Sequence, residues 1–328
     1  MRVLILGAGG MIGAKLAKRL VEDGRLAGRA ITALALADLT APDRPTGDIP
    51  VDVQAADITA DATAEHLIAT RPDVIYHLAA MVSGAAERDF EGGYRVNMDA
   101  SRALFEAIRQ AHDADGYTPR LIFASSLAVY GAPLPDPVPD DQLRAPQSSY
   151  GTQKAIVELL LDDYTRRGFF DGIGLRLPTI VIRPGAPNAA ASGFFSGILR
   201  EPLAGQSSTL PVGRDVKHWL ASPRAAVSFL IHAAGLDGAA VGPRRTMTMP
   251  GVATTVGGQI AALERVAGPE ATALIEDRPD PAIAAIINTW PRAFAPERAL
   301  KLGFVAEGSV DDLIAVYLED DAPEGMGP

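Results

Sequence analysis

Short apolar runs alternate with amphipathic stretches along the first 180 residues of the chain. The runs have the length of buried strands, and the stretches between them repeat an apolar residue every three or four positions, as one face of a helix does. Strands are therefore predicted over residues 3–6, 31–37, 51–56, 73–78, 121–124 and 173–182. Helices are predicted from Ile12 onward and over 62–70, 91–111 and 150–167. Apolar strands that alternate with helices predict an α/β protein with a doubly wound parallel sheet.

The pattern is less regular after residue 183, where prolines and glycines interrupt it. Ser222 followed by Pro223 is typical of an N-cap and a first helical position, and predicts a helix to about Gly235. Further helices are predicted over 255–266, 281–289 and 309–318, with a loose acidic end from Glu319. We expect a sheet domain of residues 1–183, to which 214–245 returns, and a smaller mixed C-terminal lobe of residues 184–213 and 246–328.

The composition excludes several classes of protein. The 328 residues carry a net charge of −10 without a basic cluster, so neither a nucleic acid nor an anionic membrane surface is expected as partner. The absence of cysteine removes disulfides and thiolate sites, and the five histidines lack the spacing of metal ligands. No apolar stretch is long enough for a membrane span or a signal peptide. The expectation is a cytoplasmic protein without a metal.

A glycine-rich segment joins the first predicted strand to the first predicted helix. Gly7, Gly10 and Gly13 have the spacing GxxGxxG. Glycines allow a tight turn and a close approach of a pyrophosphate to the backbone, while the helix start at Met11 and Ile12 offers unpaired N–H groups. The alternative is an ordinary glycine-rich turn. The position between strand and helix favours dinucleotide binding.

Two acidic residues follow the next two predicted strands. Asp38 stands 25 residues after Gly13, where a carboxylate can bind both ribose hydroxyls and repel a 2′-phosphate, which favours NAD over NADP. The alternative is a turn cap, and Arg44 in the following loop could still meet a phosphate. Asp57, with Ile58, is a candidate partner for the adenine.

A tyrosine and a lysine share one face of the predicted helix 150–167. Tyr150 and Lys154 form a YxxxK motif, in which the ammonium would bring the tyrosine pKa toward the working pH. Such a tyrosine can act as the base in alcohol oxidation. Ser126 ends a predicted strand 24 residues earlier and could bind the reacting oxygen. The alternatives are an amphipathic helix and a serine that completes a strand end; a serine hydrolase is disfavoured because there is no GxSxG elbow.

These motifs together resemble those of the extended short-chain dehydrogenase/reductase family. The resemblance is carried by GxxGxxG, Leu78-Ala79-Ala80, Val96-Asn97, the segment from Ser125 to Gly131, and YxxxK. It implies a Rossmann-like fold, NAD as cofactor, and Ser126, Tyr150 and Lys154 as catalytic residues. It also implies that NAD is contacted by Leu78, Ala79, Ala80, Asn97, Tyr150, Lys154, Pro178 and Thr179.

The resemblance further implies a homodimer formed through the helical stretches 91–111 and 150–167. Leu104 and Ile108 lie four residues apart in the first stretch, and Ile156 and Leu160 do so in the second. These apolar stripes could pair across a dimer axis. The alternative is that both stripes face the chain's own sheet.

A closer resemblance, to one group within the family, implies oxidation of the C2 hydroxyl of a small, four-carbon sugar acid. The segments concerned are 81–84, 150–170, 176–185, 187–195 and 242–245. The carboxylate of such a substrate needs a cation, and Arg183 is the candidate, with a structural ion pair as the alternative. Lys217 and His218 are possible second anchors. The candidates for binding substrate hydroxyls are Ser83, Asn188 and Ser192.

Two other functions are weighed against this one. A nucleotide-sugar epimerase or dehydratase would hold NAD tightly and would need an arginine for the diphosphate. The corresponding position falls near Val216, and no such arginine is evident there. A non-catalytic NAD-binding protein is disfavoured because Ser126, Tyr150 and Lys154 are all present.

Overall fold

The computed structural model describes residues 1–185 and 192–322. The chain forms two compact units that each combine separate segments. Unit 1 comprises residues 1–129, 148–177 and 227–247, and unit 2 comprises 130–147, 178–226 and 248–328. The predicted division differs from these units in placing residues 130–147, 178–183 and 214–226 with the sheet domain, and residues 246–247 with the lobe.

Unit 1 is built on a seven-stranded sheet with the order β13-β9-β7-β6-β1-β4-β5. The pairs from β9 to β5 are all parallel, as the apolar strand sequences predict. The strands are β1 (Arg2–Leu6), β4 (Ala33–Asp38), β5 (Val51–Ala55), β6 (Val74–His77), β7 (Arg120–Ser126), β9 (Asp171–Leu177) and β13 (Thr246–Thr248). From β1 the chain adds β4 and β5 on one side and β6, β7 and β9 on the other, so the strand order reverses at β1. The predicted doubly wound, Rossmann-like α/β fold is confirmed, and ligands of such folds bind at the carboxyl ends of the strands near this reversal.

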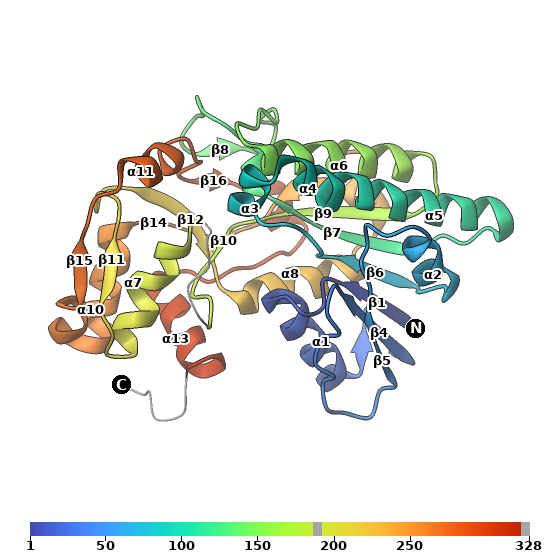
Figure 1. The fold of residues 1–328 in the computed structure, drawn as a ribbon, viewed down its shortest axis with the longest axis horizontal. Helices are drawn as coiled ribbons and strands as arrows, with labels where there is room; N and C mark the ends of the chain where they lie inside the picture. The colour runs from blue at the N-terminus through green and yellow to red at the C-terminus, as the bar shows by residue number, and fades with distance from the viewer. Residues whose placement is uncertain (186–191, 323–328) are drawn as a thin grey trace. The chain divides into compact units, whose positions relative to one another are not determined.

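Helices cover both faces of this sheet (Figure 1). In that view α1 and the later part of α8 lie on one side, and α2, α5 and α6 on the other. The second group shares a core with the strands, in which Phe105, Phe123 and Leu161 are fully buried. The helices are α1 (Met11–Asp23), α2 (Thr63–Ala69), α3 (Ser83–Arg88), α4 (Phe90–Tyr94), α5 (Ala100–Asp115), α6 (Ser149–Arg166), α8 (Pro223–Gly235) and α9 (Gly238–Val241).

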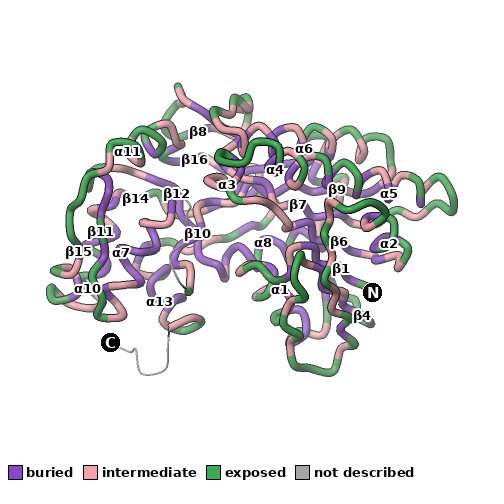
Figure 2. Tube along the Cα trace, viewed as in Figure 1, coloured by how far each residue is buried: buried purple, intermediate pink, exposed green. Residues whose placement is uncertain are grey.

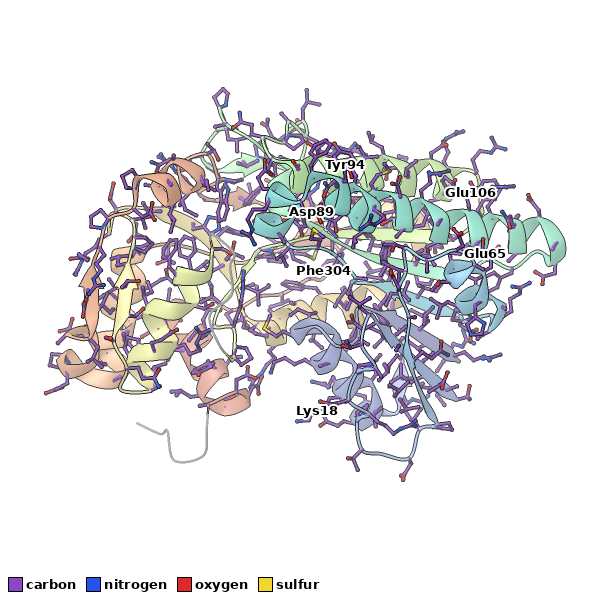
Figure 3. The ribbon with its side chains drawn as sticks, in the orientation of Figure 1. Lys18, Glu65, Asp89, Tyr94, Glu106 and Phe304 are labelled. Carbon is purple, nitrogen blue, oxygen red and sulfur yellow. The ribbon has the colours of Figure 1, made fainter. Side chains whose placement is uncertain are left out.

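The predicted helix 91–111 is interrupted. A π-helical turn, η1 (Arg95–Asp99), joins α4 to α5, and the helix runs on to Asp115. Asp89, labelled in Figure 3, caps the start of α4 because its Oδ1 accepts the Gly92 amide at 2.9 Å. A period of 3.6 residues does not reveal a single extra residue in one turn, so the sequence analysis missed this feature.

Pro178 divides the apolar run predicted as one strand over 173–182. β9 ends at Leu177, and β10 (Thr179–Ile180) joins a different, three-stranded sheet of order β10-β12-β14 in unit 2. The other two strands are β12 (Lys217–Ala221) and β14 (Val252–Thr255). Proline lacks the N–H that a ladder needs, which explains why the chain leaves the first sheet here.

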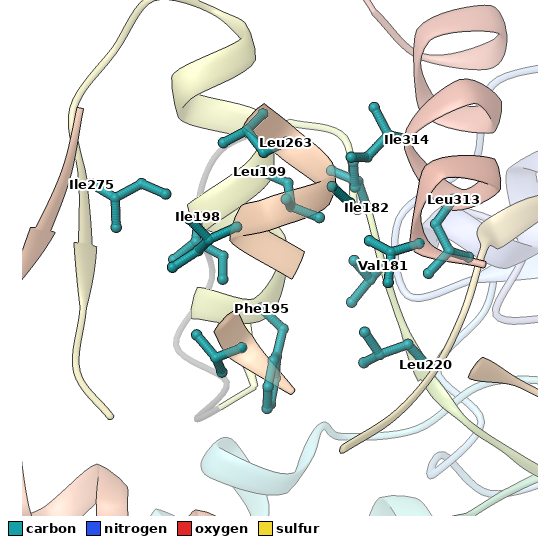
Figure 4. Packing of buried hydrophobic residues seen from close by; sticks show 14 of the residues in the cluster. Val181, Ile182, Phe195, Ile198, Leu199, Leu220, Leu263, Ile275, Leu313 and Ile314 are labelled. Carbon is teal, nitrogen blue, oxygen red and sulfur yellow. The ribbon is translucent and has the colours of Figure 1, made fainter. Parts of the chain in front are cut away.

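The core of unit 2 lies between this small sheet and three helices (Figure 4). Phe195, Leu220, Leu263 and Leu313 are buried there. The helices of the unit are α7 (Gly193–Leu203), α10 (Val256–Thr272), α11 (Pro281–Ile287), α12 (Glu297–Lys301) and α13 (Val310–Asp320). Six short strands complete the described pieces outside the two sheets: β8 (Val138–Pro139), β11 (Ser208–Leu210), β15 (Ile275–Asp277) and β16 (Phe294–Ala295) in unit 2, and the hairpin strands β2 (Arg25–Leu26) and β3 (Arg29–Ala30) in unit 1.

Two local predictions in the C-terminal half have different outcomes. Ser222 caps α8 as predicted, because its Oγ accepts the Ala225 amide at 2.9 Å ahead of Pro223. The loose end predicted from Glu319 is wrong for its first two residues. α13 continues through Asp320, and both carboxylates accept from Arg224. Ion pairs between sequence-distant residues cannot be read from a local acidic composition.

Buried residues follow the strands and the inner faces of the helices in both units (Figure 2). None of the helices within the described ranges is long and apolar enough to cross a membrane.

Candidate active site

The glycine-rich loop between β1 and α1 is shaped by two of its three glycines. A Cβ on Gly7, whose φ is +86°, would lie 2.5 Å from the Ala79 amide nitrogen, and one on Gly13 would lie 2.1 Å from the Gly7 carbonyl oxygen. These glycines allow β1, α1 and the segment after β6 to approach one another closely. A Cβ on Gly10 would make only an ordinary 3.5 Å contact with Gly7, so the chain itself does not require glycine there.

The start of α1 is suited to bind an anion. Gly10 is its N-cap and, having no side chain, makes no capping hydrogen bond, while Met11 and Ile12 form the first turn and are partly exposed. Amide groups at an uncapped helix start, with the helix dipole behind them, favour a phosphate. The room above Gly10 and this helix start together fit the pyrophosphate of a dinucleotide.

Asp38 lies beside the glycine loop at the end of β4. Its Oδ2 accepts the Gly9 amide at 2.8 Å, and its Oδ1 accepts the Leu39 amide at 2.7 Å. The second bond is the turn cap weighed in the sequence analysis, and the first orients the carboxylate toward the glycine loop. Binding of the ribose by Asp38 stays a prediction. Arg44 donates to the Val51 carbonyl, which ties this side chain to the neighbouring strand.

Asp57 forms a local turn after β5. Its Oδ1 accepts from the amide and the hydroxyl of Thr59 at 2.8 and 2.7 Å, and these bonds hold the pKa of the carboxyl below its usual value. The side chain is exposed, and Ile58 is half-buried in the same turn. The adenine contact predicted for these two residues stays a prediction.

Tyr150 and Lys154 come together on the first turns of α6. Ser148 caps the helix by accepting the Gly151 amide at 3.1 Å, and the Lys154 Nζ lies 5.7 Å from the centre of the Tyr150 ring. The same Nζ donates to the Ala124 carbonyl at 2.9 Å and lies 4.7 Å from the centre of the Phe123 ring. The lysine is therefore held between its own helix and β7.

Burial weakens the charge of this lysine. Lys154 is 2% exposed, and desolvation lowers its pKa to about 7, while the carboxylate of Glu158 acts in the opposite direction. A lysine in this environment changes its protonation near neutral pH. A cation of this kind beside a phenol favours the phenolate, which is the state of Tyr150 that can accept a proton.

Ser126 is the last residue of β7 and is half-buried. Its Oγ accepts the Ala128 amide at 3.2 Å, which is the strand-end bond that the alternative interpretation requires. This bond uses one lone pair of the hydroxyl and leaves its proton able to point elsewhere. Ala124, which accepts from Lys154, lies two residues earlier on the same strand.

Asn97 organises the segment that follows β6. The amide of this buried residue accepts from the Met81 amide at 2.8 Å and donates to the Met81 carbonyl at 3.0 Å and to the Gln153 Oε1 at 2.7 Å. The π-helical turn η1 contains Asn97, and a Cβ on Gly93 would lie 2.8 Å from the Gln153 amide nitrogen. Asn97 therefore fixes the chain beside Leu78, Ala79 and Ala80 rather than presenting its own amide outward.

The sequence analysis did not identify His77 as part of this network. The Ser101 hydroxyl donates to the Asn97 carbonyl at 2.8 Å, so it accepts from His77 Nε2 at 2.7 Å. Burial, helped by the nearby Lys154 charge, lowers the pKa of His77 to about 3, so the ring is neutral. The sequence signal that could have identified His77 is its position directly before the segment Leu78-Ala79-Ala80.

Thr179 is fixed by a buried histidine in unit 2. His218 Nδ1 lies 3.2 Å from the Pro291 carbonyl, which can only accept, so Nδ1 carries the proton and Nε2 accepts from the Thr179 hydroxyl at 2.6 Å. The ring stacks on Phe195 with centroids 4.8 Å apart, and burial lowers its pKa to about 4. His218 is therefore neutral and positions β10. It does not supply the second positive anchor suggested from the sequence.

Arg183 follows β10 and is bound to its own unit. Its Nε donates to the Ile180 carbonyl and its Nη2 to the Ser192 hydroxyl, both at 3.0 Å. Arg200, from α7, donates to the Arg183 carbonyl at 2.6 Å. The structure thus brings together Arg183 and Ser192, two of the predicted substrate residues; Asn188 lies outside the described residues.

Ser83 is the first residue of α3 and is half-buried in unit 1. Four residues later on this helix, Glu87 accepts the Ser149 amide at 3.0 Å, immediately before Tyr150. This bond connects α3 to the start of α6. A role of Ser83 in binding substrate stays a prediction, as does the role of buried Pro178 beside the nicotinamide.

The chain belongs to the NAD dependent epimerase/dehydratase family, whose model matches residues 3–221. The sequence resemblance to the extended short-chain dehydrogenases is thereby confirmed, and so is NAD as the cofactor. The observed glycine loop, uncapped α1 and Asp38 carboxylate fit that cofactor.

Two curated relatives match almost the whole chain. It is 48% identical over 324 residues to a D-erythronate dehydrogenase from Cupriavidus necator, covering 98% of both proteins. It is 39% identical over 321 residues to a D-erythronate dehydrogenase from Haemophilus influenzae, covering 98% of this chain and all of that protein. A crystal structure described as the nucleoside-diphosphate-sugar epimerase from Agrobacterium tumefaciens is 57% identical, with a TM-score of 0.96 over 98% of this chain and 94% of that one.

Proposed function

We propose that this protein is an NAD-dependent dehydrogenase that oxidises the C2 hydroxyl of D-erythronate, or of a closely related small sugar acid, to the 2-oxo acid. The observation that carries the reaction type is the buried Lys154 ammonium group, held 5.7 Å from the Tyr150 ring by the Ala124 carbonyl. The two full-length relatives named D-erythronate dehydrogenase support the choice of substrate.

In this proposal each catalytic residue has a separate task. Tyr150, as phenolate, takes the proton of the C2 hydroxyl, and Lys154 stabilises that phenolate. Ser126 donates a hydrogen bond to the reacting oxygen and orients the hydroxyl. Bound NAD supplies the acceptor for the C2 hydride. The substrate loses one proton and one hydride and becomes the 2-oxo acid.

The residues that would hold NAD come from the loops described above in unit 1 and from β10. The amides at the start of α1 would bind the pyrophosphate, and Asp38 would accept from the ribose hydroxyls. Asn97 would act indirectly, by fixing the segment 78–81. Thr179 would contribute through the backbone that His218 holds in place.

Arg183 is proposed to bind the substrate carboxylate. Its guanidinium is held in one orientation by the Ile180 carbonyl and the Ser192 hydroxyl. A fixed guanidinium can bind a carboxylate with less loss of side-chain freedom than a mobile one. Ser83, Ser192 and Asn188 are the proposed partners of the substrate hydroxyls.

A nucleotide-sugar epimerase with tightly held NAD is the second candidate, because the Agrobacterium tumefaciens relative carries that description. Such an enzyme needs a cation for the substrate diphosphate. On either side of Val216, Arg214 pairs with Asp277 at 3.1 Å and Lys217 pairs with Asp136 at 3.5 Å. Both cations are occupied by carboxylates of unit 2, which favours the dehydrogenase.

The two candidates are separated by what happens to the cofactor. Purified enzyme is mixed with NAD and D-erythronate, and NADH absorbance is followed against D-threonate, the C2 epimer, as matched control. We expect NADH to accumulate over many turnovers with D-erythronate and far more slowly with D-threonate. If no NADH forms with any four-carbon sugar acid while a UDP-sugar is interconverted with its epimer, the epimerase is the correct function.

We also infer a homodimer, with α6 as its contact surface. The structure changes the residues involved, because Leu104 and Ile108 are buried in the core of their own unit. Ile156 and Leu160 are half-buried, and Leu159 beside them is 57% exposed. The α6 stripe therefore supports the contact and the α5 stripe does not. Sedimentation at micromolar concentration should show a dimer that Leu159→Lys weakens; a wild-type monomer would contradict this inference.

A further inference from the structure

A buried ionic cluster of Ser125, Glu158 and Arg176 lies next to Lys154 in unit 1. Glu158 has no exposed surface, and its carboxylate accepts from Arg176 Nη2 at 2.7 Å and from Arg176 Nε at 3.0 Å. The Ser125 hydroxyl donates to the same carboxylate at 2.5 Å. Arg176, on β9, is 6% exposed and Ser125, on β7, 3%. The cluster is therefore closed off from water.

The cluster continues the line of the proposed catalytic residues. Tyr150, Lys154 and Glu158 follow one another at four-residue intervals along one face of α6. Opposite them on β7, the Ala124 carbonyl accepts from Lys154 and the Ser125 hydroxyl donates to Glu158. The next residue on that strand is Ser126. The same two elements thus hold the reactive groups and two of the three members of the cluster, while β9 supplies Arg176.

Stability alone is a weak reason for this arrangement. Removing two charges from water costs several kcal/mol per ion, and apolar replacements of buried ion pairs are often as stable. A carboxylate that pairs with Arg176 does, however, place a negative charge one helical turn from Lys154. At the low effective dielectric constant of the interior that charge acts strongly on the ammonium group.

We propose that Glu158, held by Arg176 and Ser125, is a positioning residue that raises the fraction of Lys154 that is protonated at neutral pH and so sets the pH range in which Tyr150 can act as base. This inference rests on the proposed function. Apart from Glu158, the contacts described for Lys154 are the Ala124 carbonyl and the Phe123 and Tyr150 rings.

The other titratable and charged groups around Lys154 do not fill this role. Tyr150, from the same helix, becomes negative only when it acts as base. His77, from β6, is neutral because burial holds its pKa at about 3. Arg176, from β9, is positive and opposes the effect of Glu158. Glu158 is also the charged partner that raises the pKa of Lys154 against the lowering caused by burial.

The test replaces the charge without changing the shape. In Glu158→Gln the Lys154 ammonium loses its negative neighbour, so its titration midpoint should fall by at least about one pH unit, a tenfold change in its acid dissociation constant. The alkaline limit of kcat/KM should move to lower pH by a similar amount. Glu158→Asp keeps the charge and should restore most of the wild-type profile.

Lysine labelled with ¹³C provides a readout that does not depend on activity. The chain has five lysines, so the Lys154 signal can be assigned by its loss in Lys154→Met. Glu106→Gln is the matched control, because Glu106 (Figure 3) also pairs with an arginine and accepts from a tyrosine in unit 1. That variant should leave the Lys154 titration unchanged.

Glu158→Gln leaves Arg176 without its counter-charge and can fail to fold. The paired variant Glu158→Gln, Arg176→Gln removes both charges, and a smaller downward shift of the Lys154 midpoint is expected in it. A lower melting temperature with an unchanged Lys154 midpoint, in either folded variant, overturns the inference. Failure of the proposed function is distinguishable, since full activity of Tyr150→Phe would reject the base while the lysine titration still reports on Glu158.

Discussion

Lys154 in unit 1 and His218 in unit 2 are both basic groups buried almost completely, at 2% and 3% exposure, yet their surroundings differ. Lys154 lies one turn from the carboxylate of Glu158, which is itself fixed by Arg176. His218 lies between a threonine hydroxyl and a peptide carbonyl, stacked on Phe195. Unit 1 keeps charges inside its core at this point, and unit 2 keeps a neutral ring.

The two sites differ in the groups that compensate the buried base for its loss of water. Burial lowers the pKa of both groups, to about 7 for Lys154 and about 4 for His218. Near neutral pH the lysine still exchanges its charge, while the histidine is a fixed hydrogen-bonding group. Charge is retained where the proposed proton transfer needs it, and avoided where only the position of β10 has to be maintained.

The largest expected effect is the loss of the base in unit 1. Tyr150→Phe keeps the ring near Lys154 but removes the proton acceptor, so kcat should fall by about 100-fold or more while NAD still binds. Steady-state kinetics measure the first and quenching of protein fluorescence by NADH the second. Tyr164→Phe is the matched control, because Tyr164 lies on the same helix and donates to Glu106. Near-wild-type turnover in Tyr150→Phe would show that Tyr150 is not the base.

The second largest expected effect is a change in the preference for NAD over NADP when Asp38, beside the glycine loop, is replaced. Asp38→Ser removes two charged acceptors from the ribose and the repulsion of a 2′-phosphate, so the preference for NAD over NADP should shrink by about 10–100-fold. The ratio of kcat/KM for the two cofactors measures it. Asp57→Ser, which disturbs only the turn with Thr59, should change the ratio much less. A wild-type enzyme that uses NADP equally well would remove Asp38 from the ribose site.

Arg183 tests whether unit 2 also contributes a charge. If its guanidinium binds the substrate carboxylate, Arg183→Ala should raise KM for the sugar acid by about tenfold or more and KM for NAD much less. Arg214→Ala removes an exposed cation of unit 2 that pairs with Asp277 and should leave both constants near wild type. Equal changes in the two constants would mean that Arg183 only maintains the bonds to Ile180 and Ser192.

The sequence predicted unit 1 better than unit 2 for a physical reason. Strands of a covered parallel sheet are continuous apolar runs, and a phosphate loop needs glycines at fixed positions such as Gly7 and Gly13. Both requirements are local in sequence. The parallel sheet and the position of Asp38 at the end of a strand follow from them.

Unit 2 depends on contacts between distant residues. β10 is two residues long, and it is fixed by His218, which in turn depends on Pro291, 73 residues further on. No hydrophobic period or sequence motif predicts such a contact. For the same reason the sequence suggested His218 as an anchor and treated 173–182 as one strand. In unit 1, the sequence left open whether Leu104 and Ile108 face a partner or the chain's own sheet, and the structure buries them in the core. In unit 1 the Glu158–Arg176 pair was missed because its partners lie on different elements.

The smallest effect expected concerns His218 and the stability of the fold in acid. The histidine has a pKa of about 4 when folded and 6.5 when unfolded, so unfolding takes up a proton between these values. The stability that the neutral ring provides is complete above pH 6.5 and is lost progressively as the pH falls toward 4. At about pH 5 the loss amounts to about 2 kcal/mol, or a few degrees in melting temperature.

In His218→Asn, which keeps a donor for the Pro291 carbonyl, the difference in melting temperature between neutral pH and about pH 5 should shrink by that amount. It should not vanish, because His77 in unit 1 is also buried and neutral. His66→Asn, at an exposed position on α2, should keep the wild-type slope, and an unchanged slope in His218→Asn would show that the ring is not held neutral by burial. The kcat of His218→Asn should stay far closer to wild type than that of Tyr150→Phe, because the histidine fixes a strand and takes no part in proton transfer.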